Sequence, residues 1–195
     1  MSSRTLSEIT ATCTKAARSA GCPWGMAEEA GAAARILSAH GLPGAEALAS
    51  LLGNPRRCGC NPDAQAPDCA IARLAALLDA PPSDTVEFDA VAAPLLLLGF
   101  ALIDTGAWTL EWNGGYAVVD AQGLQVTGDL PPDIAKVTVR KGGATKGQPR
   151  MADWRSQPVD PKAWCNLEVL ADRLLVPESE QSRVAGAGPG TQKDE

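Results

Sequence analysis

Aromatic side chains and histidine are scarce in this chain of 195 residues, which holds five Trp, two Phe, one Tyr and one His. The hydrophobic fraction is nevertheless 45%, so a core built mainly from Leu, Ala, Val and Ile is expected. The chain also lacks a serine-hydrolase elbow, a His-Glu-x-x-His site and a nucleotide phosphate loop, which removes the most recognisable catalytic motifs from consideration.

Surplus positive charge and long apolar runs are missing too. The net charge of −6 argues against nucleic acid as a partner, because nucleic-acid binding needs a basic surface. The longest apolar run, 92–103, is interrupted by Pro94 and Gly99 and is shorter than the ~20 residues that span a bilayer. Residues 1–7 show no apolar signal-peptide core. We therefore expect a cytoplasmic protein without a membrane partner, whose six cysteines are reduced thiols.

The first 80 residues predict four helices. Thr5 and Glu8 form a capping box that opens a helix ending at Gly21. Pro23 can occupy the first turn of a second helix, which places Trp24 on its apolar face, together with Ala27, Ala30, Ala34 and Leu37. A third helix is expected over 45–52, and a fourth over 69–78, capped by Asp68.

From Thr85 to Arg140 the pattern is that of strands. Alternation predicts a strand over 85–89, and the apolar run 95–103 predicts a buried strand. Asn113-Gly114 lies between two strand-like segments and is typical of a tight hairpin turn. Further strands are expected over 124–127 and 136–140. We predict that Trp108 and Trp112 share one face of their strand.

The last helix is expected to begin at Asp160-Pro161, to place four side chains inward, and to stop at Val176-Pro177; these four are Trp164, Leu167, Leu170 and Leu174. The sequence thus predicts an α+β fold in which an N-terminal helical bundle packs on a mainly antiparallel β-sheet, with a C-terminal helix. Within one compact domain we expect a helical subdomain over 1–80 and a sheet with the last helix over 81–180. A flexible tail over 181–195 completes the chain.

The charge is laid out unevenly. No Lys or Arg lies between Arg73 and Lys136, a stretch with nine carboxylates, whereas residues 136–155 carry six cations and one acid. The simpler interpretation is that the two segments neutralise each other at the surface. The alternative is that residues 141–147, with three glycines, form a mobile lid over an anionic ligand.

The cysteines and the adjacent carboxylates indicate a metal site or a catalytic pair only weakly. Cys58, Cys60 and Cys69, with His40, could supply zinc ligands, but the spacing is not that of common zinc sites, so we expect no metal and no cofactor. Glu28 and Glu29 are adjacent on a helix and point about 100° apart. They cannot form a carboxylate dyad, although one could face a ligand while the other is solvated.

Three stretches carry a family resemblance: residues 6–9 with 15–31, residues 94–97, and residues 176–188. Together they resemble an uncharacterised bacterial protein family, a domain of unknown function that implies no activity. A fainter similarity links Gly41-Leu42-Pro43-Gly44 to the malate/lactate dehydrogenases of the non-Rossmann type. Where that family continues with Ser-His-Gly, this chain has Ala45-Glu46-Ala47, so the catalytic histidine is absent at the matching place.

Two functions from different classes remain open. One is a ligand-binding or accessory protein that works beside a metabolic enzyme and binds a protein partner or an anionic small molecule. The other is a small enzyme that acts on an anionic metabolite. The candidate ligand-binding residues are Trp24, Glu28, Arg140, Lys141 and Arg183. Arg183 belongs to an arm, 178–190, that could fold back on the turn at Pro23–Gly25 or could remain disordered.

Overall fold

The computed structural model describes residues 2–54, 58 and 68–174, and its first helix begins at the predicted capping box. The Thr5 hydroxyl accepts from the Glu8 N–H at 3.2 Å, and the Thr5 N–H donates to Glu8 Oε2 at 2.7 Å. This helix, α1 (Leu6–Ser19), is followed by α2 (Trp24–Ala39), and between them Gly21 has a φ of 99°, an angle that favours glycine. The first two predicted helices are therefore confirmed.

Helices α3 (Gly44–Leu52) and α4 (Ala70–Asp79) also lie where the sequence predicts them. The predicted cap of α4 is wrong, however. Cys69, not Asp68, is the N-cap and makes no side-chain capping bond, because Asp68 and Cys69 form a short strand, β2, that pairs with the sheet.

The apolar run 95–103 is not a strand. It forms a 3₁₀ turn, η1 (Pro94–Leu96), that continues into the short helix α5 (Leu97–Ile103). All residues from Pro94 to Ala101 are buried, and a segment covered on every side loses the periodicity that distinguishes a helix from a strand. Pro94 at the first position of the turn favours the helical start.

The main sheet has the strand order β2-β3-β7-β4-β5-β6, and all neighbours are antiparallel except β2 and β3. Its five longer strands are β3 (Val86–Ala92), β4 (Trp108–Trp112), β5 (Gly115–Asp120), β6 (Gly123–Gly128) and β7 (Ile134–Lys141). The mainly antiparallel sheet and the α+β class are as predicted.

The hairpin at Asn113-Gly114 is confirmed, since Trp112 pairs with Gly115 across the turn. Only Gly114 has a positive φ, at 94°, so the turn requires a left-handed conformation at the glycine alone. Trp108 and Trp112 are both buried, as expected for residues four apart on the face that the helices cover. The Phe100 ring of α5 meets the Trp108 ring edge-on at 4.7 Å.

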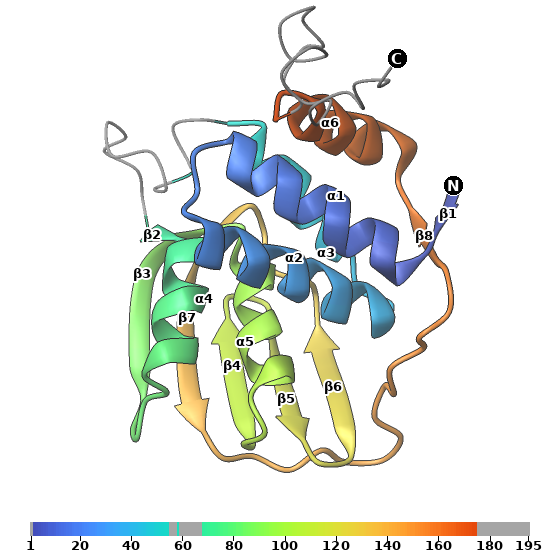
Figure 1. Cartoon of the computed structure of the whole chain (residues 1–195). Helices are drawn as coiled ribbons and strands as arrows, with labels where there is room; N and C mark the ends of the chain where they lie inside the picture. Colours follow the sequence, from blue (N-terminus) through green and yellow to red (C-terminus); the bar gives the residue numbers. More distant parts are fainter. Residues whose placement is uncertain (1, 55–57, 59–67, 175–195) are drawn as a thin grey trace, which may run out of the picture.

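The helices lie on one side of the sheet, in successive layers (Figure 1). Helix α5 contacts β4 and β5, α2 contacts α5 and α4, and α1 packs on α2. The last helix, α6 (Pro161–Asp172), packs on α1 and α3. The C-terminal helix therefore lies with the N-terminal helices, on the side away from the sheet (Figure 1).

The start of α6 is confirmed, because the Asp160 carboxylate accepts from the Ala163 N–H at 2.9 Å. Trp164 and Leu167 are buried as predicted. Leu174 is 37% exposed and lies beyond the helix, so the prediction that it faces inward is wrong. The helix ends at Asp172, before the expected stop at Val176-Pro177, which lies outside the described residues. A second, two-stranded sheet joins β1 (Ser2–Arg4) to β8 (Gln157–Val159).

Glycines allow the closest helix contacts. A Cβ at Gly99 of α5 would lie 2.5 Å from the Ala33 Cβ of α2, and a Cβ at Gly44 of α3 would lie 2.5 Å from the Ala34 carbonyl oxygen. These distances are shorter than any van der Waals contact. The small residues of α2 therefore set how closely α5 and α3 approach it.

Candidate functional sites

The sequence-predicted site residues are distributed over separate elements. Trp24 is 58% exposed at the start of α2, where the Arg18 guanidinium lies 5.4 Å from its ring centre, so its predicted place on the buried face is wrong. Glu28 is exposed on the same helix, and Arg140 and Lys141 are exposed at the end of β7. Arg183 and its arm lie outside the described residues.

The segment that follows β7 is fastened to the outer face of the sheet, the face without helices. The Gly142 N–H donates to the Ala107 carbonyl at 2.7 Å, and the Thr109 hydroxyl donates to the Gly142 carbonyl at 2.8 Å. Farther along, the Thr145 N–H donates to Asp120 Oδ2 at 2.8 Å. These bonds attach the segment to the sheet at Gly142 and Thr145. Residues 142–145 lie within the segment that the alternative interpretation takes as a mobile lid, and they are here called the tethered wall.

This wall borders a pocket of about 270 Å³ on β4, β5, β6 and β7. Its polar side chains are those of Thr109, Glu111, Tyr116, Gln125, Arg140 and Lys146. Arg140 Nη2 lies 3.3 Å from Glu111 Oε1, and Tyr116 is 40% exposed. Of the predicted candidates, Arg140 lines this pocket. Tyr116 and Gln125 were missed, because only the pairing of β4, β5 and β6 brings them to the same face.

The expected neutralisation of charge occurs between neighbouring strands. Lys136 Nζ on β7 lies 2.7 Å from Glu87 Oε2 and 3.9 Å from Asp89 Oδ1, both on β3. The hydrogen bond and the charge of Glu87 raise the pKa of Lys136. These pairs are exposed, so they contribute little to stability. Lys146 and Lys141 are not members of these pairs.

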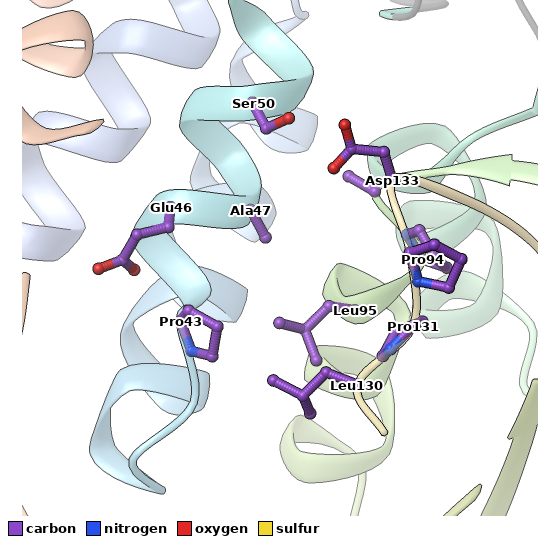
Figure 2. A pocket seen from close by; sticks show the side chains of 11 residues that line it. Pro43, Glu46, Ala47, Ser50, Pro94, Leu95, Leu130, Pro131 and Asp133 are labelled. Carbon is purple, nitrogen blue, oxygen red and sulfur yellow. The ribbon is translucent and has the colours of Figure 1, made fainter. Parts of the chain in front are cut away.

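A second hollow, here called the proline cleft, lies between α3 and the segment that joins β6 to β7 (Figure 2). It has a volume of about 350 Å³ and is lined by Pro43, Glu46, Ala47, Ser50, Ala93, Pro94, Leu95, Leu130, Pro131, Pro132 and Asp133. Four of these eleven residues are proline, and the walls are mostly apolar. Sequence reasoning missed this cleft, although Pro131-Pro132 marks a break between strands.

Ala93, in the wall of the proline cleft, has an unusual backbone. Its φ of 55° and ψ of 54° are left-handed, and it is the one non-glycine residue with a positive φ in the part of the chain that the structure describes. The Ala93 N–H donates to the Asp133 carbonyl at 2.9 Å, which ties the two sides of the wall together. Such conformations cost on the order of 1–3 kcal/mol and are found preferentially at functional sites.

Glu29, rather than Glu28, is the partly buried member of the adjacent carboxylates. Its Oε2 is buried and has no hydrogen-bond partner in the part of the chain that the structure describes. Burial raises the pKa of Glu29, and the charges of Asp79 and Glu28 raise it further. One of the two carboxylates is thus partly buried and the other is exposed, an arrangement that the sequence left open, and Glu29 is not among the residues that line either hollow.

Cys58 and Cys69 are buried, whereas Cys60 lies outside the described residues. His40 is held by its own helix, with Nδ1 2.8 Å from the Ile36 carbonyl. Within 2–54, 58 and 68–174, no group of three or more His, Cys, Asp or Glu could hold a metal ion. The zinc hypothesis for all three cysteines stays untested. In the same residues, no helix is long and apolar enough to cross a membrane.

Comparison with known proteins gives one match. A search of curated proteins and a search of solved structures each found no significant relative. Residues 4–79, which include α1 to α4, match the model of a family described as a protein of unknown function (DUF3726). Of the three stretches that carried the sequence resemblance, residues 6–9 with 15–31 lie in this match, and 94–97 and 176–188 lie outside it. The N-terminal helical part of the chain is thus similar to a family of unknown function, the kind of family that the sequence resemblance indicated.

Proposed function

We propose that this chain is a non-catalytic binding protein, an accessory subunit of bacterial metabolism, and that it binds a small anion in the pocket on the outer face of the sheet. The observation that carries the proposal is the pocket itself. Arg140 and Lys146 line it from two different segments, beside the phenol of Tyr116.

The chemistry of these groups suits a carboxylate or phosphate. Arginine offers a planar set of donors that can bind two oxygens at once, and a phenol adds a neutral donor. Glu111 now lies against Arg140. An anion would therefore have to compete with this carboxylate, which favours ligands with more than one negative charge.

The tethered wall supports a preformed site. Gly143 has a φ of 129°, and a Cβ there would lie 2.4 Å from Thr109 Oγ1 and 3.0 Å from Val118 Cγ1. Only glycine allows the backbone to come this close to the sheet. A pocket whose wall is already fixed loses little conformational entropy when it binds a ligand.

The remaining parts of the proposal are cytoplasmic localisation and a protein partner. The net charge of −6 and six cysteines are in line with a soluble protein of a reducing compartment. A partner enzyme could be identified by pull-down with the purified chain and confirmed by a second method with separately purified proteins.

Calorimetric titration with phosphate, malonate, succinate and citrate tests the pocket. We expect saturable binding to at least one anion and roughly tenfold weaker binding after Arg140→Gln, since a hydrogen bond to a charged group contributes about 1.5–3 kcal/mol. Lys162→Gln removes an exposed cation of α6 and is the matched control, which should leave the affinity unchanged.

Glu111→Gln should change the anion affinity in the opposite direction from Arg140→Gln. It removes the carboxylate that competes for Arg140 and should strengthen anion binding. The proposal is wrong if no anion binds to the wild type, or if Arg140→Gln and Lys162→Gln bind equally well.

A further inference from the structure

The geometry points to a ligand class for the pocket on the outer face of the sheet: we propose that this pocket binds an acidic α-amino acid, in which an ammonium group lies beside two carboxylates. The inference rests on the proposed anion binding and narrows it to one class of anion. It is carried by the charges of both signs that line the pocket and by the strand register, which fixes the order in which those charges lie.

The strand register places the two cations of the pocket at opposite ends. Arg140 on β7 pairs with Thr109 on β4, and the same row continues across β5 to Gln125 on β6. The Lys146 N–H donates to Gln125 Oε1 at 2.7 Å, so Lys146 lies at the far end of this row. Three strand spacings, roughly 14 Å, separate β7 from β6, and the long side chains of Arg140 and Lys146 can shorten this distance from both ends. A ligand that reaches both cations needs two negatively charged groups.

Glu111 lies between these two ends. It occupies the neighbouring row, where it pairs with Thr138 on β7 and with Tyr116 on β5. Its side chain is 52% exposed, and it is the one acid among the described residues that line the pocket. A carboxylate in this place repels negative charge, but it can accept a hydrogen bond from an ammonium group.

The contact between Glu111 and Arg140 is compatible with such a group. Arg140 Nη2 lies 3.3 Å from Glu111 Oε1, which is longer than the roughly 2.7–2.9 Å of strong charge-assisted hydrogen bonds. A carboxylate has two oxygens with about four acceptor sites, and a guanidinium group has five N–H donors. Glu111 can therefore accept from a ligand ammonium group while Arg140 binds a ligand carboxylate, so the ligand extends this ion pair instead of breaking it.

The charges of ligand and pocket then match group by group. The pocket offers two cations and one carboxylate, and an acidic amino acid carries two carboxylates and one ammonium group. The Tyr116 phenol, 40% exposed and directly opposite Glu111, supplies a neutral donor to a ligand carboxylate. A simple dicarboxylate meets Glu111 as a like charge, and an amino acid with an uncharged side chain cannot bind both cations through carboxylates.

Calorimetric titrations of the full chain with three ligands test this class. L-Aspartate has all three charged groups, succinate lacks the ammonium group, and L-asparagine lacks the second carboxylate. Each is titrated at constant ionic strength to about 20 mM, roughly 20-fold the Kd of about 1 mM expected for a ligand of this size. L-Aspartate should bind about tenfold more tightly than either comparator, because each comparator loses a charge-assisted hydrogen bond.

Glu111→Gln separates this inference from the proposed anion binding, because it should act in opposite directions on two ligands. It should weaken the binding of L-aspartate about tenfold and strengthen that of succinate, which no longer meets a like charge. Lys146→Gln should weaken the binding of L-aspartate about tenfold and leave that of L-asparagine unchanged. Asp129→Asn, the matched control for Glu111→Gln, removes an exposed carboxylate that does not line the pocket and should change neither affinity. A melting curve establishes that each variant is folded.

The inference is overturned if L-aspartate binds no more tightly than succinate, or if Glu111→Gln changes the two affinities in the same direction. It is also overturned if Glu111→Gln and Asp129→Asn behave alike. Any of these results, with succinate still bound by the wild type and bound more weakly after Arg140→Gln, leaves the proposed anion binding intact and removes only the amino acid. If none of the three ligands binds to the wild type, this inference fails, and the failure of phosphate, malonate and citrate as well would remove the anion pocket with it.

Discussion

The contact between α2 and α5 makes a quantitative prediction for Gly99→Ala. The added methyl carbon would lie 2.5 Å from the Ala33 Cβ and 3.0 Å from the Ala33 Cα, whereas carbon atoms are at their optimum at about 3.5–4.0 Å. Both atoms belong to the rigid part of a helix, so neither can rotate away. The two helices would have to separate by roughly 1 Å.

Two opposing effects set the change that Gly99→Ala makes to the free energy of unfolding. Overpacking a well-filled core costs about 1–3 kcal/mol. Because the obstructing atoms cannot move, we expect the destabilisation at this contact to lie at the upper end, about 3 kcal/mol. Replacing glycine by alanine within a helix contributes about 1 kcal/mol in the other direction. The net loss in the free energy of unfolding is therefore about 2 kcal/mol, which lowers the Tm by about 4–8 °C for a domain of this size.

Gly25→Ala is the matched control. Gly25 also lies in a helix, in the first turn of α2, but no atom of the described residues lies within 4 Å of a Cβ built there. The same chemical change should leave the stability unchanged or raise it by up to about 1 kcal/mol. Urea denaturation followed by circular dichroism measures both variants.

A double-mutant cycle with Ala33→Gly identifies the contact. Alone, Ala33→Gly should destabilise by about 1 kcal/mol, through the lower helix propensity of glycine. In the Gly99→Ala background it removes the obstructing methyl, so it should cost less or stabilise. The reasoning is refuted if Gly99→Ala unfolds at or above the wild-type urea concentration, or if the two substitutions are additive.

Three further predictions concern single groups. Asp160→Ala removes the cap of α6 and should lower the free energy of unfolding by about 1 kcal/mol, measured by urea denaturation; no change would show that the cap is dispensable. In the native protein Cys165, which is exposed, should react with Ellman's reagent, whereas Cys13 should react only after unfolding, because burial raises its pKa to about 12. In denatured protein, prepared anaerobically without reductant, all six thiols should react. Hydrogen bonds from the Arg155 side chain lower the pKa of Asp153 to about 2. The ionised carboxylate therefore contributes stability above its unfolded pKa of about 3.9, and this contribution is lost as the pH falls toward 2. In ¹³C NMR titrations, Arg155→Gln should return this pKa toward its ordinary range, and an unchanged midpoint would contradict the assignment.

Local signals in the sequence determined several elements without help from the rest of the fold. The capping box at Thr5, the turn at Asn113-Gly114 and the cap at Asp160 each combine side-chain chemistry with a backbone shape that only a few residues adopt. In β4, Trp108, Leu110 and Trp112 alternate with Thr109 and Glu111, which is the sequence pattern of a strand with an apolar face and a polar face. The residues that make up each of these signals lie within a few positions of one another, so each signal can be recognised in a single sequence.

The tertiary structure decided two features that these local signals do not determine, the conformation of residues 95–103 and the exposure of Trp24. The run 95–103 could be taken for a strand because residues 95–101 are all buried, packed against α2, α4 and the sheet, and burial on every side removes the periodicity that distinguishes a helix from a strand. Trp24 is exposed at the first position of α2, and its ring contacts the Arg18 guanidinium of α1, a contact that depends on how the two helices pack.

The sites depended on the fold even more strongly. Arg140 could be named from its charge, but Tyr116 and Gln125 reach the same pocket only because β5 and β6 pair in register beside β4. Ser50 and Asp133 are 83 positions apart in the sequence and face each other because α3 packs against η1. The sequence determined which side chains were available for binding, and long-range packing decided which of them meet, since proximity in a folded chain is set by burial of distant apolar surfaces.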